Sequence, residues 1–438
     1  MSAAQAASGA SSGLLLPSGK ILAGGRTDLG SLTHKGYFAL ARYNANGSLD
    51  TSFGRKGKIA TPLGVHFGAG MNALVRQPDG KIVAGGSSYN GHNFDFALVR
   101  YKPSGAVDTS FGHDGKVTTN FFGGDSISGL ALQPNGMIVA VGVAGIVGAD
   151  GNSGNFALAR YKANGLLDQS FGSGGKVQTK IGAVSGASSV VLQPDGKIVV
   201  AGSGLARYNS DGSLDPSFGS GGIVTTPPGV VASLALEPDG KIVVAGSSIL
   251  RYLPDGSLDP SFGSGGQVSL TRNFFGKAVL IQPDGKIVVA GRVGGGGGTL
   301  AVARLQQDGS LDSGFGSGGM VVTGFGIAYS EANALARTVG GKLLVAGDSG
   351  AGKNLIVGRY NSDGSLDPSF GTGGKVTTSF TVCAVPTLKG KKLSGAKLAL
   401  KNARCSVGKV SGRGRVVSQS RPAGTWLKVG TKVSIRLR

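Results

Sequence analysis

The sequence predicts an all-β protein: a seven-bladed β-propeller of four-stranded blades, followed by a small α+β module. The first observation is a two-part motif, which reads QPDGKIVVAG at Gln193–Gly202 and ARYNSDGSLDPSFG at Ala206–Gly219. The second is its recurrence at intervals of 44 to 61 residues, a repeat length that propellers use. The central glycine of the first part recurs at Gly19, Gly80, Gly136, Gly196, Gly240, Gly285 and Gly341. The third is composition, since 81 glycines and 40% hydrophobic residues are typical of many short strands and turns.

Each repeat predicts four strands. An apolar first strand such as Ser233–Leu236 and a second such as Ile242–Ala245 flank the Pro-Asp-Gly turn. Proline presets φ, aspartate caps the turn and glycine takes the positive φ, so the pair forms a hairpin. A third strand such as Phe156–Tyr161 and a fourth such as Lys116–Thr119 complete the blade. Four strands in each of seven repeats give a seven-bladed propeller.

The ends of the repeat array predict how the ring closes. The array begins on a first strand, Ser12–Leu16, and ends on a fourth strand, Lys375–Thr378. We expect the final strand to complete the first blade, which would leave no long open sheet edge. The alternative, an open β-solenoid, needs terminal caps that the sequence does not show.

The two motifs together resemble the bacterial delta-60 repeat. The resemblance covers residues 11–380, after a stretch at 1–10 that we expect to be disordered. It implies a propeller of secreted or envelope proteins and no defined activity.

An arginine and an aspartate recur eight residues apart in every repeat, and a phenylalanine follows each aspartate by three residues. The pairs are Arg42 and Asp50, Arg100 and Asp108, Arg160 and Asp168, Arg207 and Asp215, Arg251 and Asp259, Arg304 and Asp312, Arg359 and Asp367. We interpret them as fasteners of the third-strand turn, with the phenylalanine filling the gap between blades. The alternative is a sevenfold anion or metal site. An outer strand cannot line the channel, and the turns offer too few oxygen ligands for calcium.

Signatures of catalysis and of cofactors do not emerge from the residues. The histidines occupy unrelated repeat positions, at His34, His66, His92 and His113. Glutamate occurs only at Glu237 and Glu331, and no nucleophile elbow or phosphate loop is recognisable. We therefore expect no cofactor, no metal and no enzymatic activity. The alternative is a lyase or glycan hydrolase at the channel mouth, where Asp125, Glu331 and His66 would begin to supply polar groups.

The repeats differ mainly in two connections. The segment between second and third strands ranges from Ser203-Gly204 to Val143–Asn155, and the link to the next blade varies similarly. Both connections should emerge on one face of the ring, while the constant turns occupy the other. A diversified loop face on a rigid scaffold indicates binding of a protein or glycan, unless it reflects drift of unconstrained loops.

The last part of the chain, 381–438, has a different composition. It holds 14 of the 44 Lys and Arg residues and no Asp or Glu, which leaves 30 basic against 23 acidic residues before it. Leu393–Ala403 has helical periodicity, and Val416–Ser418 and Val433–Leu437 read as strands. We expect a separate βαββ module.

This module resembles a PASTA domain. The matching positions are Val385, Pro386, Leu388, Gly390, Ala396, Leu400, Gly408, Val416, Ser418, Gln419, Ser420, Pro422, Gly424, Gly430 and Val433. The resemblance implies association with bacterial peptidoglycan, although many such domains serve as spacers. The basic charge suits an anionic wall polymer, whereas a single aromatic and no groove-reading motif argue against nucleic acid. Trp426, Arg415 and Arg421 are the candidate ligand contacts.

Together these features predict a non-catalytic propeller scaffold of the cell envelope or a secreted one, with a purely structural spacer as the alternative. No apolar run is long enough to span a bilayer. The start, Met1-Ser-Ala-Ala, lacks a signal sequence, and we suppose that the true N-terminus lies upstream or is missing. Cys383 and Cys405, the only cysteines, predict a disulfide and an oxidising compartment, with buried free thiols as the alternative.

Overall fold

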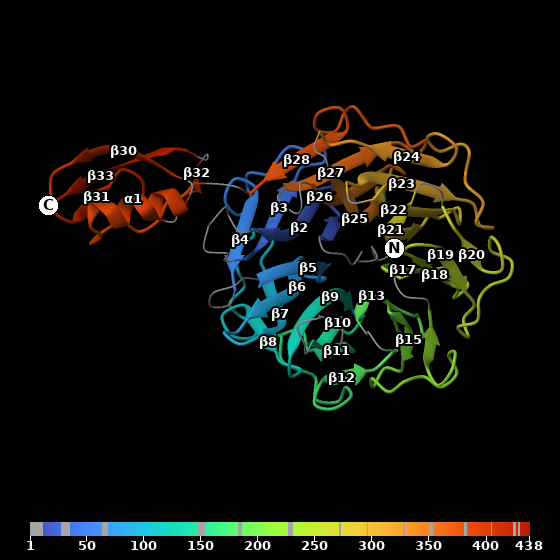
Figure 1. The fold of residues 1–438 in the computed structure, drawn as a ribbon. Coiled ribbons are helices and arrows are strands. Elements are labelled where there is room, and N and C mark those ends of the chain that lie inside the picture. Colours follow the sequence, from blue (N-terminus) through green and yellow to red (C-terminus); the bar gives the residue numbers. More distant parts are fainter. Residues whose placement is uncertain are drawn as a thin grey trace.

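The protein is described from a computed structural model, in which seven sheets surround a central axis (Figure 1). The structure describes residues 12–27, 36–63, 69–146, 154–182, 186–226, 231–270, 273–295, 297–326, 329–349, 354–380, 383–403, 405–423, 426–427 and 430–438. The expected disorder at 1–10 concerns residues outside these ranges. The predicted fold class, a seven-bladed propeller followed by a small α+β module, is confirmed.

Every blade is an antiparallel sheet of four consecutive strands. The inner strands are β1 (Ser12–Leu15), β5 (Ala69–Arg76), β9 (Gly124–Leu132), β13 (Ala187–Leu192), β17 (Ser233–Leu236), β21 (Phe275–Ile281) and β25 (Ser330–Arg337). The second strands are β2 (Ile21–Thr27), β6 (Ile82–Tyr89), β10 (Ile138–Ile146), β14 (Ile198–Gly202), β18 (Ile242–Ala245), β22 (Ile287–Val293) and β26 (Leu343–Ser349). The third strands are β3 (Tyr37–Tyr43), β7 (Phe94–Tyr101), β11 (Asn155–Tyr161), β15 (Gly204–Tyr208), β19 (Ile249–Tyr252), β23 (Thr299–Leu305) and β27 (Asn354–Tyr360). The outer strands are β4 (Lys58–Pro62), β8 (Lys116–Thr119), β12 (Lys176–Thr179), β16 (Ile223–Thr225), β20 (Gln267–Val268), β24 (Met320–Thr323) and β28 (Lys375–Ser379).

The Pro-Asp-Gly turn forms as the sequence predicts. In blade 4, the backbone N–H of Gly196 donates to the Gln193 carbonyl at 3.0 Å, and Gly196 has φ of 87°. The Asp195 carboxylate accepts the Lys197 N–H at 3.1 Å, which caps the turn. Proline, aspartate and glycine therefore each satisfy a separate requirement of one tight hairpin.

The predicted strand exchange between the ends of the propeller is wrong. The final strand β28 pairs with β27 of its own blade, and β4 already supplies the outer strand of the first blade. The ring closes instead by packing of whole blades. Ile21 and Val357 share one buried cluster, and the Tyr43 hydroxyl donates to the Thr378 hydroxyl at 2.6 Å. Because the array starts with an inner strand and ends with an outer one, every blade is complete without exchange.

The core consists of apolar layers between adjacent blades. Each cluster takes side chains from two neighbours, as where Phe96 of blade 2 packs with Phe121 and Ile127 at the start of blade 3. The phenylalanine of the second repeat motif is at most 1% exposed in every blade. These seven buried residues are Phe53, Phe111, Phe171, Phe218, Phe262, Phe315 and Phe370.

The C-terminal module contains one helix, α1 (Leu393–Asn402), and five strands, β29 (Cys383–Ala384), β30 (Ser406–Ser411), β31 (Val416–Gln419), β32 (Trp426–Leu427) and β33 (Lys432–Leu437). The sheet order is β30-β33-β31, with β29 paired to β32. Ala396 and Leu400 of the helix pack on Val433 and Ile435 of the sheet. The predicted βαββ order omitted β30, whose side chains are half-buried or exposed and give no apolar alternation.

Candidate functional site

The repeated arginines join neighbouring blades. In blade 4, Arg207 Nε donates to Asp215 Oδ2 at 2.6 Å, and Nη1 donates to the Pro254 carbonyl of blade 5 at 2.5 Å. The guanidinium also lies 4.7 Å from the Phe218 ring centroid, within cation–π distance. One buried side chain thus binds its own turn, the next blade and the aromatic plug.

This contact is repeated around the ring without interruption. Each arginine donates to a carbonyl of the following blade, and the acceptors in order are Pro103, Ala163, Ser210, Pro254, Gln307, Ser362 and Ala45. A second circuit runs beside it, in which the glycine after each buried phenylalanine donates its N–H to the next blade, as Gly371 does to Asn46 at 2.8 Å. Both circuits include the step from the last blade to the first.

The lysine that follows the glycine of the first hairpin turn is a partner that the sequence reasoning missed. Lys286 Nζ lies 2.9 Å from Asp312 Oδ2, and Lys342 Nζ lies 2.6 Å from Asp367 Oδ2. Burial alone raises the pKa of Asp259, but hydrogen bonds from Ser261 and Arg251 outweigh it and lower the pKa to about 2. The repeated aspartates are therefore ionised and internally compensated. Within the described residues, no three His, Cys, Asp or Glu side chains gather as a metal site.

The variable face shows where the repeats diverge chemically. Because the strands alternate in direction, the β2–β3 type of connection and the links between blades leave on this face. The residue after the last glycine of the first repeat motif is small or apolar in blades 2 to 5, at Ser87, Val143, Ser203 and Ser247. It is charged in the three adjacent blades 6, 7 and 1, at Arg292, Asp348 and Arg26. One arc of the ring therefore departs from the repeat.

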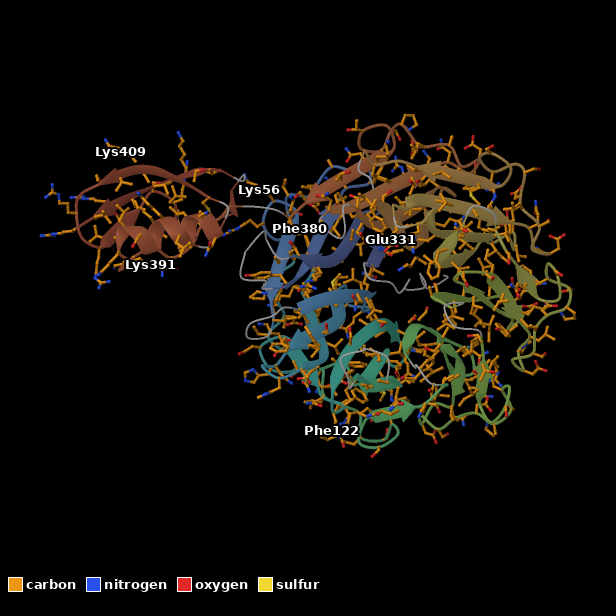
Figure 2. All side chains as sticks on the ribbon, viewed as in Figure 1. Lys56, Phe122, Glu331, Phe380, Lys391 and Lys409 are labelled. Atoms are coloured by element: carbon orange, nitrogen blue, oxygen red, sulfur yellow. The ribbon has the colours of Figure 1, made fainter. Side chains whose placement is uncertain are left out.

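The departure produces a cluster between blades 6 and 7, formed by Phe275, Lys277, Arg292, Tyr329 and Glu331, which we call the blade 6–7 cluster. Glu331 lies on the inner strand of blade 7, at the inner side of the ring (Figure 2). Its Oε2 is 3.3 Å from Arg292 Nε and its Oε1 is 3.7 Å from Lys277 Nζ. The Glu331 side chain is 9% exposed, against 29% for Arg292 and 25% for Lys277. The carboxylate is buried beneath two accessible cations.

Aromatic groups border the same cluster. The Phe275 ring centroid lies 5.8 Å from both Arg292 Cζ and Lys277 Nζ. Burial raises the pKa of Tyr329, and its hydrogen bond to Glu331 raises it further. The phenol therefore stays protonated and donates to the carboxylate. The cluster thus places two accessible cations beside an apolar ring.

The other channel-mouth residues suggested by the sequence do not join this cluster. Asp125 is 1% exposed on blade 3, where its carboxylate accepts the N–H groups of Phe121 at 2.7 Å and of Gly145 at 3.0 Å. Burial raises its pKa. Asp125 thus anchors a loop, and blades 3 and 7 are not neighbours. His66 lies outside the described residues.

The loop anchored by Asp125 holds an exposed aromatic residue in a strained conformation. Phe122 has φ of 68° and is 83% exposed, whereas the adjacent Phe121 is 2% exposed. A bulky residue pays roughly 1–2 kcal/mol for a left-handed backbone, a cost that glycine avoids.

We expect Phe122→Gly to raise the free energy of unfolding by about 1 kcal/mol, because the strain relieved exceeds the backbone entropy that glycine adds. Urea unfolding measures the change. The matched variant Phe121→Gly should lose about 3 kcal/mol or more, since it leaves a cavity at the contact with Phe96. A loss of stability in Phe122→Gly would contradict the conclusion that the backbone of Phe122 is strained.

The candidate contacts in the C-terminal module differ in how they are placed. Arg415 and Arg421 are exposed on either side of β31, and Arg415 Nη1 donates to the Gly390 carbonyl at 2.9 Å. The side chain of Trp426 lies outside the described residues. All twelve Lys and Arg residues of the module whose side chains are described are exposed, among them Lys391 and Lys409 (Figure 2). No helix in the described residues is long and apolar enough to cross a membrane.

Comparison with solved structures finds similar chains at low identity. A protein of unknown function from Bacteroides caccae is 17% identical, with 68% of this chain and 98% of that chain covered and a TM-score of 0.40. The WD40 propeller domain of Doa1 is 14% identical, with 80% and 92% covered and a TM-score of 0.44. Puromycin hydrolase is 16% identical, with 86% and 53% covered and a TM-score of 0.47. A search of curated proteins found no match.

Family models match both parts of the chain. The PASTA model matches residues 384–438. The model described as a domain of unknown function (DUF5122) beta-propeller matches 16–53, 77–111, 133–171, 193–218, 237–262, 282–315 and 341–370, which together exceed half of the chain. The chain therefore belongs to the DUF5122 β-propeller family and carries a C-terminal PASTA domain.

Proposed function

We propose that this protein is a non-catalytic scaffold of the cell envelope. In this proposal the propeller recognises a ligand on its variable face, and the PASTA domain holds the protein on an anionic wall polymer, peptidoglycan in the first place. The observation that carries the proposal is the unopposed charge of the domain. Its 14 Lys and Arg residues face no Asp or Glu of the same domain, and those described are exposed.

Charge of one sign on a small domain supports attachment to a polyanion. Cations that have no internal partner keep their full attraction for carboxylates and phosphates outside the protein. The propeller has a different arrangement, since the repeated aspartate of each second motif contacts the repeated arginine of the same blade. The two parts are thus suited to different tasks, rigid display and electrostatic attachment.

A binding role for the propeller agrees with the state of Glu331. Two cations contact its carboxylate, and Tyr329 donates to it. A fixed ion pair under an accessible cationic surface suits recognition better than proton transfer.

Sedimentation with purified peptidoglycan sacculi tests the attachment. We expect the full chain to co-sediment at low salt, and a variant with Lys391, Lys409, Arg413 and Arg421 all replaced by glutamine to lose about tenfold or more in affinity. Added salt should also lower the affinity of the wild-type protein for sacculi, because exposed charges are screened.

The matched control replaces four exposed propeller lysines with glutamine, at Lys56, Lys102, Lys162 and Lys180. It removes the same charge from the other part of the chain and should retain sacculus binding. Equal loss in both variants would show that only net charge matters, and no loss in the first would contradict attachment through the PASTA domain.

A further inference from the structure

We infer that the blade 6–7 cluster binds the carboxylate group of a ligand, through Arg292 and Lys277 and beside the ring of Phe275. This deepens the recognition role proposed above for the variable face and rests on it. The ligand class is a carboxylate joined to a carbon skeleton with an apolar face. A sugar acid and the C-terminal residue of a peptide both have this chemistry.

The two cations keep hydrogen-bonding capacity for such a group. The Arg292 side chain is 29% exposed, its Nε faces Glu331 at 3.3 Å, and its Nη1 reaches the Gly294 carbonyl only at 3.4 Å. A guanidinium has five N–H donors and pairs best with a carboxylate through two parallel bonds. Lys277 Nζ is 3.7 Å from Glu331, longer than a hydrogen bond. Glu331 therefore neutralises one charge, and both cations can still donate to a second carboxylate.

The accessible side chains of the cluster carry positive charge. Lys277 and Arg292 both contact Glu331 across the gap between blades 6 and 7. The next acidic residue, Asp348, accepts from Asn333 Nδ2 at 2.9 Å. Asp348 shares its side of β26 with Leu344 and Ala346, which pack toward blade 1. Its charge also acts on Tyr329 of the cluster, but both carboxylates are buried, whereas Lys277 and Arg292 are accessible on the side of blade 6.

The fold itself does not require this cluster. In blade 2, Asn72 occupies the strand bulge that Lys277 occupies in blade 6, and its Nδ2 donates to the Ile127 carbonyl of blade 3 at 2.8 Å. At this position that junction uses a neutral amide. A buried ion pair is weak support for stability, because desolvation offsets most of its attraction. The ion pair at the blade 6–7 junction is therefore better explained by a ligand than by folding.

Phe275 supplies the apolar side of the site. Its ring is half-buried and lies at 5.8 Å from both cations. A ligand carboxylate that reaches Arg292 would place its adjoining C–H groups against this ring. Selectivity should therefore depend on the carboxylate together with the skeleton that carries it.

Titration calorimetry on the full chain tests the inference with two acids, galacturonate and N-acetyl-alanyl-alanine, and with their neutral counterparts galactose and the peptide amide. We expect at least one acid to bind about tenfold more tightly than its neutral counterpart. The acid with the higher affinity shows whether the natural ligand is a sugar acid or a peptide C-terminus. Arg292→Gln should weaken that acid about tenfold. Glu331→Gln should tighten it several-fold, because the internal carboxylate no longer competes.

Arg26→Gln is the matched control, since Arg26 is the equivalent residue of blade 1 and is exposed. It should leave binding unchanged. If Glu331→Gln fails to fold, Lys277→Met provides the second measurement and should weaken binding. Failure of both acids to bind the wild-type protein would overturn the inference, as would unchanged binding in Arg292→Gln.

The two proposals fail separately. Loss of acid binding in Arg292→Gln with normal sacculus sedimentation supports the propeller site alone. Normal acid binding in a protein that ignores sacculi supports the site and rejects attachment through the PASTA domain.

Discussion

Arg207→Ala is expected to lower the free energy of unfolding of the propeller by about 3–5 kcal/mol. The substitution removes the bond to Asp215, the bond to the Pro254 carbonyl of the next blade and the contact with Phe218. Asp215 is 4% exposed, so its charge would remain buried with only Lys197, at 3.0 Å, as a cationic partner. Urea unfolding followed by far-ultraviolet circular dichroism measures the loss.

The double variant Arg207→Ala with Asp215→Asn separates the two contributions. Removing the buried charge as well should restore part of the stability, because the remaining loss comes only from packing and the bond between blades. Lys102→Ala, on an exposed propeller lysine, serves as the control and should stay near the wild-type value. A loss below about 1 kcal/mol in Arg207→Ala would contradict the role of the circuit.

The circuit shows what the sequence can and cannot predict. The spacing of Arg207 and Asp215 places both on one turn, and the structure brings them together at 2.6 Å. The acceptor in the next blade is a backbone carbonyl, and such a group carries no sequence signal. Lys197 does have a sequence signal, because the lysine of Pro-Asp-Gly-Lys recurs in most repeats and therefore indicates a repeated partner.

Closure of the ring was predicted wrongly because one outer strand has a weak sequence pattern. The outer strand of the first blade, Lys58–Pro62, ends in proline and lacks the Lys-Val-Thr-Thr sequence of β8 and β28. Proline is tolerated there because an outer strand leaves one edge unpaired. The segment nevertheless forms the outer strand, because its backbone pairs with β3.

The blade 6–7 cluster could be predicted only in part. Arg292 breaks a repeat position that is serine or valine in four blades, and this departure is visible in the sequence. Its meeting with Glu331 is not visible, because the two residues lie in different blades and at different repeat positions. Only the angle between adjacent sheets brings them within 3.3 Å.

The second large effect is expected from the predicted Cys383–Cys405 disulfide of the PASTA domain, which remains a proposal because the side chain of Cys383 lies outside the described residues. The backbone places the two cysteines favourably. Cys405 follows α1, is 7% exposed and belongs to the same buried cluster as Val385, two residues after Cys383. The domain is small and its core is thin, so a covalent link across this cluster should stabilise it by ~3 kcal/mol in the chain-entropy model.

Thiol titration of the denatured, unreduced protein decides whether the bridge exists. We expect fewer than one reactive thiol per chain before reduction and two after it. Cys383→Ser, Cys405→Ser and the double variant should all lose the same stability, since each removes the same single bond. Unequal losses would instead indicate two independent thiols, of which the buried Cys405 would matter more. Two free thiols in protein recovered from its native host would contradict both the bridge and the oxidising compartment that we expect for this chain.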